Sequence, residues 1–320
     1  MITIRRVGWI AVQDSLRQVG WWFVVVLALG ALRFAARARA WMACVSAITA
    51  AGAHSANSPA LSTPALSTQH FWKATLASDA LGNLTPLGFL ASEPAKILFV
   101  RNRLSTVTAI VSVAAENAFY MASVVVMLTA GAAVFIALTD VPAQLRSGVQ
   151  AVFAGAVLAV IAAFVIARRR PAVLSRLARL LTRATGRAQA SAEQLEQVES
   201  HFYGVLAWPA TRLLRVIGWE GLFHVAAVAE VYLVLGLLPG GDDISLSQAF
   251  VLETTGRLIA VVFKMVPYRV GVDEAGGALV AGALLLNPAA GVTLALVRRI
   301  RIFFWNAVGL AFIARTDTSS

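Results

Sequence analysis

VPYRVGVDEAGG, residues 266–277, interrupts an apolar region of the chain with a proline, glycines and charged residues. Pro267 is followed four residues later by Gly271 and seven residues later by Glu274. Proline lacks a backbone N–H and ends a helix, and glycine adopts dihedral angles that other residues avoid. Within a bilayer, the backbone groups freed by such a break must line protein or a water-filled cavity. The stretch therefore predicts a broken, re-entrant helix at membrane depth.

A second stretch, TPLGFLASEPAK at residues 85–96, follows the same pattern in the first half of the chain. Pro86 ends an apolar run, Gly88 follows it, and Glu93 stands seven residues after the proline. Paired broken helices in two halves of a chain are the best sequence indication of a transporter's substrate site. We therefore predict an internal repeat, with one core at 71–138.

Polar residues accompany both breaks at matching distances. Asn83 and Lys264 each lie three positions before their proline. About 23 residues after each glutamate, the next long apolar run carries charge, at Glu116 and at Arg298. These matches extend the second repeat core over 246–314 and leave open whether the halves are inverted or parallel.

The composition places these breaks in a membrane. Hydrophobic residues make up 59% of the 320 residues and charged residues only 13%, whereas soluble proteins carry about 25% charged residues. The net charge is +11, and most arginines flank apolar runs as membrane anchors do, which argues against nucleic-acid binding. We predict an all-α, polytopic membrane helix bundle of about six to eight segments, forming one domain over 1–320.

Eight apolar runs are candidates for these segments, since a membrane-spanning helix needs about 20 residues. Four are clean, at 118–138, 148–167, 216–238 and 288–314. Four are short or carry polar groups, at 20–36, 41–53, 71–90 and 246–266.

The distribution of arginine predicts the orientation. Seven arginines crowd residues 168–187, whereas 239–247 carries two aspartates and no base, so the positive-inside rule places the first loop in the cytoplasm. The stretch 54–70 has no Asp, Glu, Lys or Arg and is expected outside. Within the loop 168–200, one helical face carries Arg176, Arg179, Arg183 and Arg187. This face suits anionic lipid headgroups, and a solvated loop helix explains it equally well.

Ionisable residues in the apolar runs are the candidate site residues. Glu253, Arg257 and Lys264 share one stripe of a helix, and glutamate four residues before arginine is the favourable ion-pair order. Such charges usually face a bundle interior or an aqueous cavity. Lys96, Arg269 and Asp273 lie beside the two breaks. Snorkelling to the interface is an alternative for Arg298, and an interfacial pair is the simpler interpretation of Glu220 and His224.

The sequence lacks the residues that several classes of function require. The single cysteine, Cys44, excludes an intramolecular disulfide and a cysteine-cluster metal site, and the four histidines form no HExxH motif. No GxxxxGK[ST] motif occurs, which excludes direct use of ATP. We therefore expect no metal, no cofactor and no enzymatic activity.

The residues around the breaks resemble the flippase-like family, also described as the transmembrane region of lysylphosphatidylglycerol synthases. The resemblance spans roughly 71–314 and rests on residues 82–96, on 267–274 and on Arg298-Arg299. GVDEAGGALVAGAL, residues 271–284, is similar to the branch found with hopanoid biosynthesis. One departure is Ala91-Ser92 before Glu93, where the family has Gly-Glu.

The resemblance implies an integral protein of the bacterial inner membrane that moves an amphipathic lipid between leaflets. The family's signature positions correspond to Asn83, Pro86, Glu93, Pro267, Gly271, Glu274 and Arg298. No aminoacyltransferase domain follows the last apolar run, so aminoacyl-lipid synthesis is not expected.

We predict a lipid translocase whose partners are phospholipid, hopanoid or polyprenyl lipids. Anionic headgroups would be attracted by Arg257, Lys264, Arg269 and Arg298. Glu93 and Glu274 would pair with these bases in the empty site. The alternatives are a non-catalytic scaffold for lipid-biosynthetic enzymes and an intramembrane lipid transferase with a buried carboxylate as general base.

Overall fold

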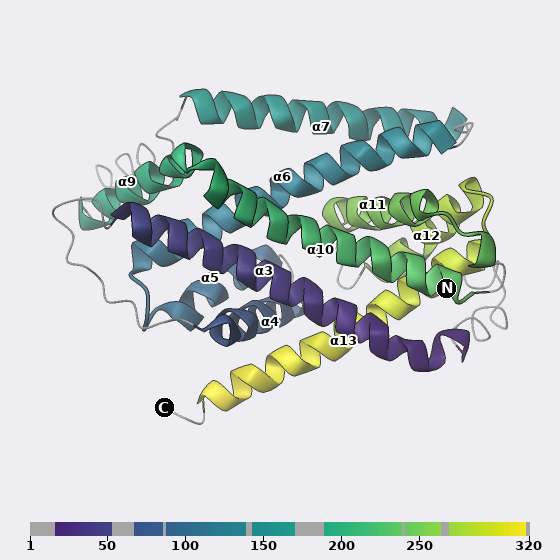
Figure 1. Ribbon diagram of the computed structural model, residues 1–320, viewed down its shortest axis with the longest axis horizontal. Helices are drawn as coiled ribbons and strands as arrows, with labels where there is room; N and C mark the ends of the chain where they lie inside the picture. The colour runs from purple at the N-terminus through teal and green to yellow at the C-terminus, as the bar shows by residue number, and fades with distance from the viewer. Residues whose placement is uncertain are drawn as a thin grey trace.

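The computed structural model describes residues 17–52, 67–85, 88–138, 143–169, 189–238, 241–263 and 269–317, and every regular element in these ranges is a helix (Figure 1). In chain order they are η1 (Gly20–Trp22), α3 (Phe23–Gly52), α4 (Thr68–Leu84), α5 (Gly88–Val100), α6 (Thr106–Leu138), α7 (Ala143–Arg169), α9 (Gln189–Gly204), η2 (Val205–Ala207), α10 (Ala210–Gly236), η3 (Gly241–Asp243), α11 (Leu246–Val262), α12 (Val272–Ala283) and α13 (Pro288–Asp317). Outside the described residues lie Pro86, Lys264, Pro267 and the four arginines Arg176, Arg179, Arg183 and Arg187.

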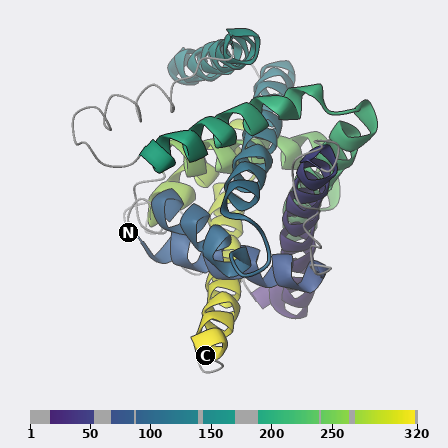
Figure 2. The same cartoon turned by 90° about the vertical axis from the view of Figure 1, so that its left-hand side faces the viewer.

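Three of the described helices are long and apolar enough to cross a membrane. They are the helix over Arg17–Ala50, which includes most of α3, and the helices α6 and α10. Large apolar side chains such as Val126, Leu158 and Val225 are exposed on the outside of the bundle. Exposed apolar residues in this number suit a lipid environment better than water. Figures 1 and 2 show α7 at the edge of the bundle, where it packs against α6.

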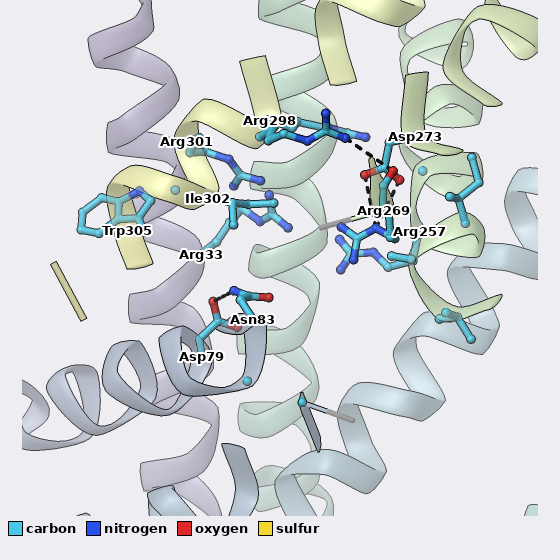
Figure 3. Close-up of a pocket in the computed structure, with 18 of the residues that line it drawn as sticks. Arg33, Asp79, Asn83, Arg257, Arg269, Asp273, Arg298, Arg301, Ile302 and Trp305 are labelled. Atoms are coloured by element: carbon cyan, nitrogen blue, oxygen red, sulfur yellow. Dashed lines mark hydrogen bonds and ion pairs between the residues drawn. The ribbon is translucent and has the colours of Figure 1, made fainter. Parts of the chain in front are cut away.

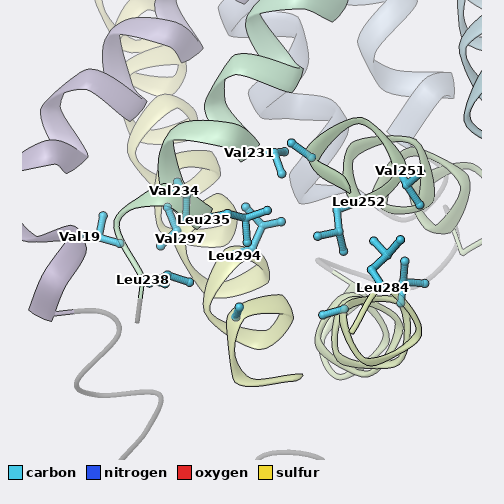
Figure 4. Close-up of a cluster of buried hydrophobic side chains, with 14 of the residues drawn as sticks. Val19, Val231, Val234, Leu235, Leu238, Val251, Leu252, Leu284, Leu294 and Val297 are labelled. Atoms are coloured by element: carbon cyan, nitrogen blue, oxygen red, sulfur yellow. The ribbon is translucent and has the colours of Figure 1, made fainter. Parts of the chain in front are cut away.

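Apolar clusters fill the two ends of the bundle. One cluster joins the start of α3, the end of α10, the start of α11, the end of α12 and the start of α13 (Figure 4). Two further clusters join the second half of α3 to the start of α4, the end of α5, the start of α6, α9 and the start of α10. The charged residues described below lie between these apolar ends.

The clusters also show that two helical hairpins enter the bundle from opposite ends. The first hairpin consists of α4 and α5, and the second consists of α11 and α12. Phe71 of α4 and Val100 of α5 belong to one end, whereas Val251 of α11 and Leu284 of α12 belong to the other. The long helices α3 and α10 run antiparallel to each other, as do α6 and α13 (Figure 1). Helix α4 packs against α13, and α11 packs against α6, so each hairpin contacts a long helix of the other half.

Two predicted helix boundaries were wrong. Residues 20–36 and 41–53 were predicted as separate runs, but α3 continues through Arg37 and Arg39. The run predicted at 118–138 is preceded by helix, since α6 begins at Thr106 and includes Glu116. In both cases the charged side chain finds a partner inside the bundle, so a charge does not end the helix.

Most of the two loops whose sides were predicted, 54–70 and 168–187, lies outside the described residues. The end of α3 and α9 meet in one apolar cluster, which contains Ile48 and Val198. Helix α9 therefore lies at the end of the bundle at which α3 ends. The prediction that these two loops lie on opposite sides of the membrane therefore stays a prediction.

Candidate functional site

A cavity of about 590 Å³ lies between the tips of the two hairpins, bordered by α3, α6, α10 and α13 (Figure 3). The bases among its lining residues are Arg33, Arg37, Lys96, Arg257, Arg269, Arg298, Arg299 and Arg301. The carboxylates among them are Asp79, Glu93, Glu253 and Asp273. Among the described residues, the lining thus holds twice as many bases as acids, and several of these bases pair with carboxylates that lie behind the lining.

Glu253 is the central acidic residue of α11, the first helix of the second hairpin. Helix α11 starts in register because Ser245 and Gln248 form a capping box, and Glu253 follows two turns later, buried. Arg257, one turn on, donates to Glu253 from 2.7 Å, and Arg298 reaches the same carboxylate from α13. The Arg298 guanidinium crosses α11 over Gly256, where a Cβ would lie only 2.5 Å from Nη1.

The first turn of α12 is held by Glu274. Gly271, with φ +85°, precedes the helix, and its N–H donates to Glu274 Oε2 at 2.8 Å. Arg299 of α13 pairs with the same carboxylate, which ties the hairpin to the last long helix. Beside it, Arg269 Nε lies 3.2 Å from Asp273 at the cavity wall. The glycine thus allows a turn that aims a carboxylate at the next helix.

In the first hairpin the charges of the corresponding ion pair are reversed. A base on the hairpin pairs with a carboxylate on the long helix that follows it. Lys96 of α5 lies 3.2 Å from Glu93 and 3.3 Å from the buried Glu116 of α6. Arg37 of α3 also pairs with Glu116, and its guanidinium lies 3.9 Å from the centre of the Tyr120 ring. In each half, a charged side chain after the hairpin's turn contacts a charge in the middle of the following long helix.

A third set of charges crosses the bundle centre. Glu230 of α10 is fully buried, and its Oε2 lies 3.2 Å from Arg33 of α3 and 3.1 Å from Arg301 of α13. No partner for Glu230 can be predicted from the sequence. The signal available was an acid deep in one apolar run and arginines in two others, but their pairing depends on three helices meeting.

Amide groups connect the two halves as well. Asn83 at the end of α4 donates to Asp79 and to Asn306 of α13, each at 3.0 Å. Figure 3 shows Asp79 and Asn83 facing the arginines of α3 and α13 across the cavity. Asn83 thus closes the first hairpin against the helix that carries Arg298.

Comparison with known proteins gives one match. A family model described as the lysylphosphatidylglycerol synthase TM region matches residues 1–309. The chain belongs to this family. No curated protein and no solved structure matches significantly.

Membership of the lysylphosphatidylglycerol synthase TM-region family confirms the resemblance drawn from the two breaks. Together with the three candidate spans, it makes the chain a membrane protein of a family involved in lipid handling. The match does not address the hopanoid branch, which stays a prediction.

The structure brings most of the candidate residues of this family member to one cavity. Its lining includes Asn83, Gly88, Glu93, Lys96, Glu253, Arg257, Arg269, Asp273 and Arg298. Glu116 and Glu274 lie behind the lining and pair with residues in it. Among the described residues, no group of three or more His, Cys, Asp or Glu could hold a metal ion.

Proposed function

We propose that the protein is a lipid translocase that moves an amphipathic lipid with an anionic headgroup between leaflets of the bacterial inner membrane. The observation that carries this proposal is the cavity between two hairpins, with eight bases and four carboxylates in its lining. Such a density of charge between two apolar ends is expensive in a membrane protein and usually marks a substrate pathway.

The hairpins are proposed to be re-entrant elements of an inverted repeat. They enter from opposite ends, and the corresponding long helices run antiparallel. In this arrangement α3, α6, α7, α10 and α13 cross the bilayer, and with the two hairpins they give seven membrane elements within the described residues. An inverted repeat supports alternating exposure of a central site to the two leaflets.

Counter-ion exchange is the proposed mode of headgroup binding. In the empty site Glu253 pairs with Arg257 and Arg298. An anionic headgroup would replace the carboxylate as partner of these guanidiniums, whose planar donors suit phosphate. An anion that displaces Glu253 adds a negative charge and leaves this buried carboxylate without its two bases, so binding favours the uptake of a compensating positive charge or proton.

The tails would remain outside the cavity. Leu84 at the tip of the first hairpin and Val261 at the tip of the second are exposed, and both border the cavity. Met121 of α6 is exposed beside them. An apolar margin of this kind lets acyl or polycyclic chains lie in the bilayer while the headgroup enters.

The test is leaflet exchange of headgroup-labelled lipids in proteoliposomes, with phosphatidylglycerol, phosphatidylethanolamine and a hopanoid compared. We expect Glu274→Gln to fold, because glutamine can still accept the Gly271 N–H, and to lose at least about tenfold in exchange, because the charge pair with Arg299 is gone. Asp243→Asn is the matched control: this aspartate is exposed in η3, outside the cavity, and its variant should exchange lipid as the wild type does.

The outcomes separate the alternatives. Exchange no faster than in protein-free liposomes for every lipid would contradict the proposal and favour the scaffold. A change in lipid mass during the assay would reveal a transferase. Exchange that is equally fast in Glu274→Gln would remove this glutamate from the pathway.

A further inference from the structure

Glu220 of α10 is a buried carboxylate that the ion-pair network leaves out. Its side chain is 1% exposed, and neither oxygen has a hydrogen-bond partner among the described residues. Every other carboxylate paired above accepts from a base or an amide. An ionised carboxylate without such a partner is strongly disfavoured in a buried position, whereas the neutral acid is tolerated.

The charges that act on Glu220 come from four helices. They are Arg37 of α3, Glu116 of α6, Lys96 of α5 and Arg257 of α11. Cys44 of α3 faces the same region, and His224 lies one turn along α10. Tyr120 of α6 stacks on the His224 ring with centroids 6.4 Å apart.

Carboxylates outnumber bases in this part of the network. Arg37 and Lys96 are shared by Glu116, and Lys96 also pairs with Glu93. Two bases therefore serve three carboxylates when Glu220 is included, and Arg257 is already bound to Glu253. One carboxylate lacks a counter-ion, and Glu220 is the one without a hydrogen bond.

We infer that Glu220 is a proton-binding site behind the cavity, and that its proton is bound more tightly when an anion occupies the cavity. Arg37 and Lys96 both line the cavity and act on Glu220. An anion that draws these bases toward itself reduces their attraction for the Glu220 carboxylate and adds a negative charge nearby. Both changes favour the protonated acid, so anion and proton bind cooperatively. This inference rests on the proposed function for the identity of the anion as a lipid headgroup.

His224 is the other titratable side chain that would carry such a proton. Its Nε2 lies 2.8 Å from the Ser123 hydroxyl, and its Nδ1 has no partner among the described residues. The ring is partly buried, and three arginines act on it, Arg257, Arg33 and Arg37, against one carboxylate, Glu253. The cationic surroundings therefore assign the proton to Glu220 rather than to His224.

Infrared spectroscopy of the purified protein tests the proton site without any transport. At neutral pH we expect a protonated-carboxyl C=O band that is absent from Glu220→Gln and present in Asp243→Asn and His224→Asn. In Glu116→Gln, Arg37 becomes available to Glu220, and we expect the band of Glu220 to decrease. A spectrum in which Glu220→Gln loses no such band would overturn the inference, whatever the protein transports.

The coupling is tested with short-chain phosphatidylglycerol as the anionic probe. A pH titration of the wild-type band should move to higher pH when the lipid is added. In return, lipid affinity should rise as the pH falls through that midpoint, by at most about tenfold per pH unit for one proton. Glu220→Gln should bind the lipid with no pH dependence over this range.

Three results contradict the coupling. They are a midpoint that phosphatidylglycerol leaves unchanged, a pH-dependent affinity that survives in Glu220→Gln, and a dependence that disappears in His224→Asn instead. If wild-type proteoliposomes exchange no lipid but the band behaves as expected, the proposed function fails and the proton site stands.

Discussion

At the residue scale, the arginines and glutamates of the bundle centre are placed by pairing rather than by hydrophobicity. Glu230 shows the extreme case, with 0% exposure and two guanidiniums at hydrogen-bonding distance. Buried ion pairs of this kind add little net stability, yet removal of one partner costs about 3–5 kcal/mol. A network that contributes little to the fold, and that is costly to disrupt at any one residue, is best explained by the site it forms.

Gly256 gives a residue-scale prediction because it makes room for Arg298. Gly256→Ala should displace the guanidinium, since the new Cβ would lie 2.5 Å from Nη1. Arginine is flexible, so the free energy of unfolding should fall by no more than about 1 kcal/mol, while loss of one charge-assisted hydrogen bond to Glu253 should slow lipid exchange about tenfold. Thermal unfolding and proteoliposome exchange measure the two effects.

Gly218→Ala is the control for that change. It introduces the same methyl group in a long helix, α10, where nothing lies within 4 Å of the new Cβ. Both stability and exchange should match the wild type or improve slightly. Equal exchange rates in the two variants would show that the Arg298–Glu253 contact does not matter for transport.

At the element scale, the second hairpin is joined to α13 by backbone contact. Gly277 of α12 and Gly291 of α13 face each other so closely that a Cβ on Gly277 would lie 2.7 Å from the Gly291 carbonyl oxygen. This approach also lets Arg299 reach Glu274. The small residues therefore set both the packing and the ion pair.

We expect Gly277→Ala to push the hairpin away from α13. Backbone atoms do not move aside as a side chain does, so overpacking should lower the free energy of unfolding by about 1–3 kcal/mol. Gly282→Ala, on the same helix, would meet only Pro288 at 3.7 Å and should be neutral or stabilising by up to about 1 kcal/mol. Chemical denaturation in detergent compares them, and an equal effect of both substitutions would contradict the close contact.

The same elements show how much of the structure can be predicted from the sequence. Local signals suffice for the apolar runs and for the stripe of Glu253 and Arg257, because both depend on spacing within one helix. The continuity of α3 through Arg37 does not follow from spacing, since it depends on Glu116 in another helix. Glu230 with Arg33 and Arg301 is non-local in the same way. Sequence therefore identifies which residues are charged at depth, and only the packing shows how they pair.

At the scale of the whole molecule, the corresponding helices of the two halves run in opposite directions. The hairpin α4–α5 and the end of α3 share one end of the bundle, while α11–α12 and the start of α13 share the other. The turn between α5 and α6, which carries Arg101 and Arg103, lies at the first end, and η3, which carries Asp243, lies at the second. The positive-inside rule then predicts that the first end lies in the cytoplasm.

Cysteine labelling tests this orientation. Asn102 in the turn between α5 and α6 and Leu285 in the turn between α12 and α13 are exposed, and Cys44 is buried. In spheroplasts, an impermeant maleimide should label Leu285→Cys at once and Asn102→Cys only after permeabilisation. The reverse pattern would invert the orientation. Labelling of both from one side would contradict hairpins that enter from opposite faces, and with it the inverted repeat on which alternating access to the cavity depends.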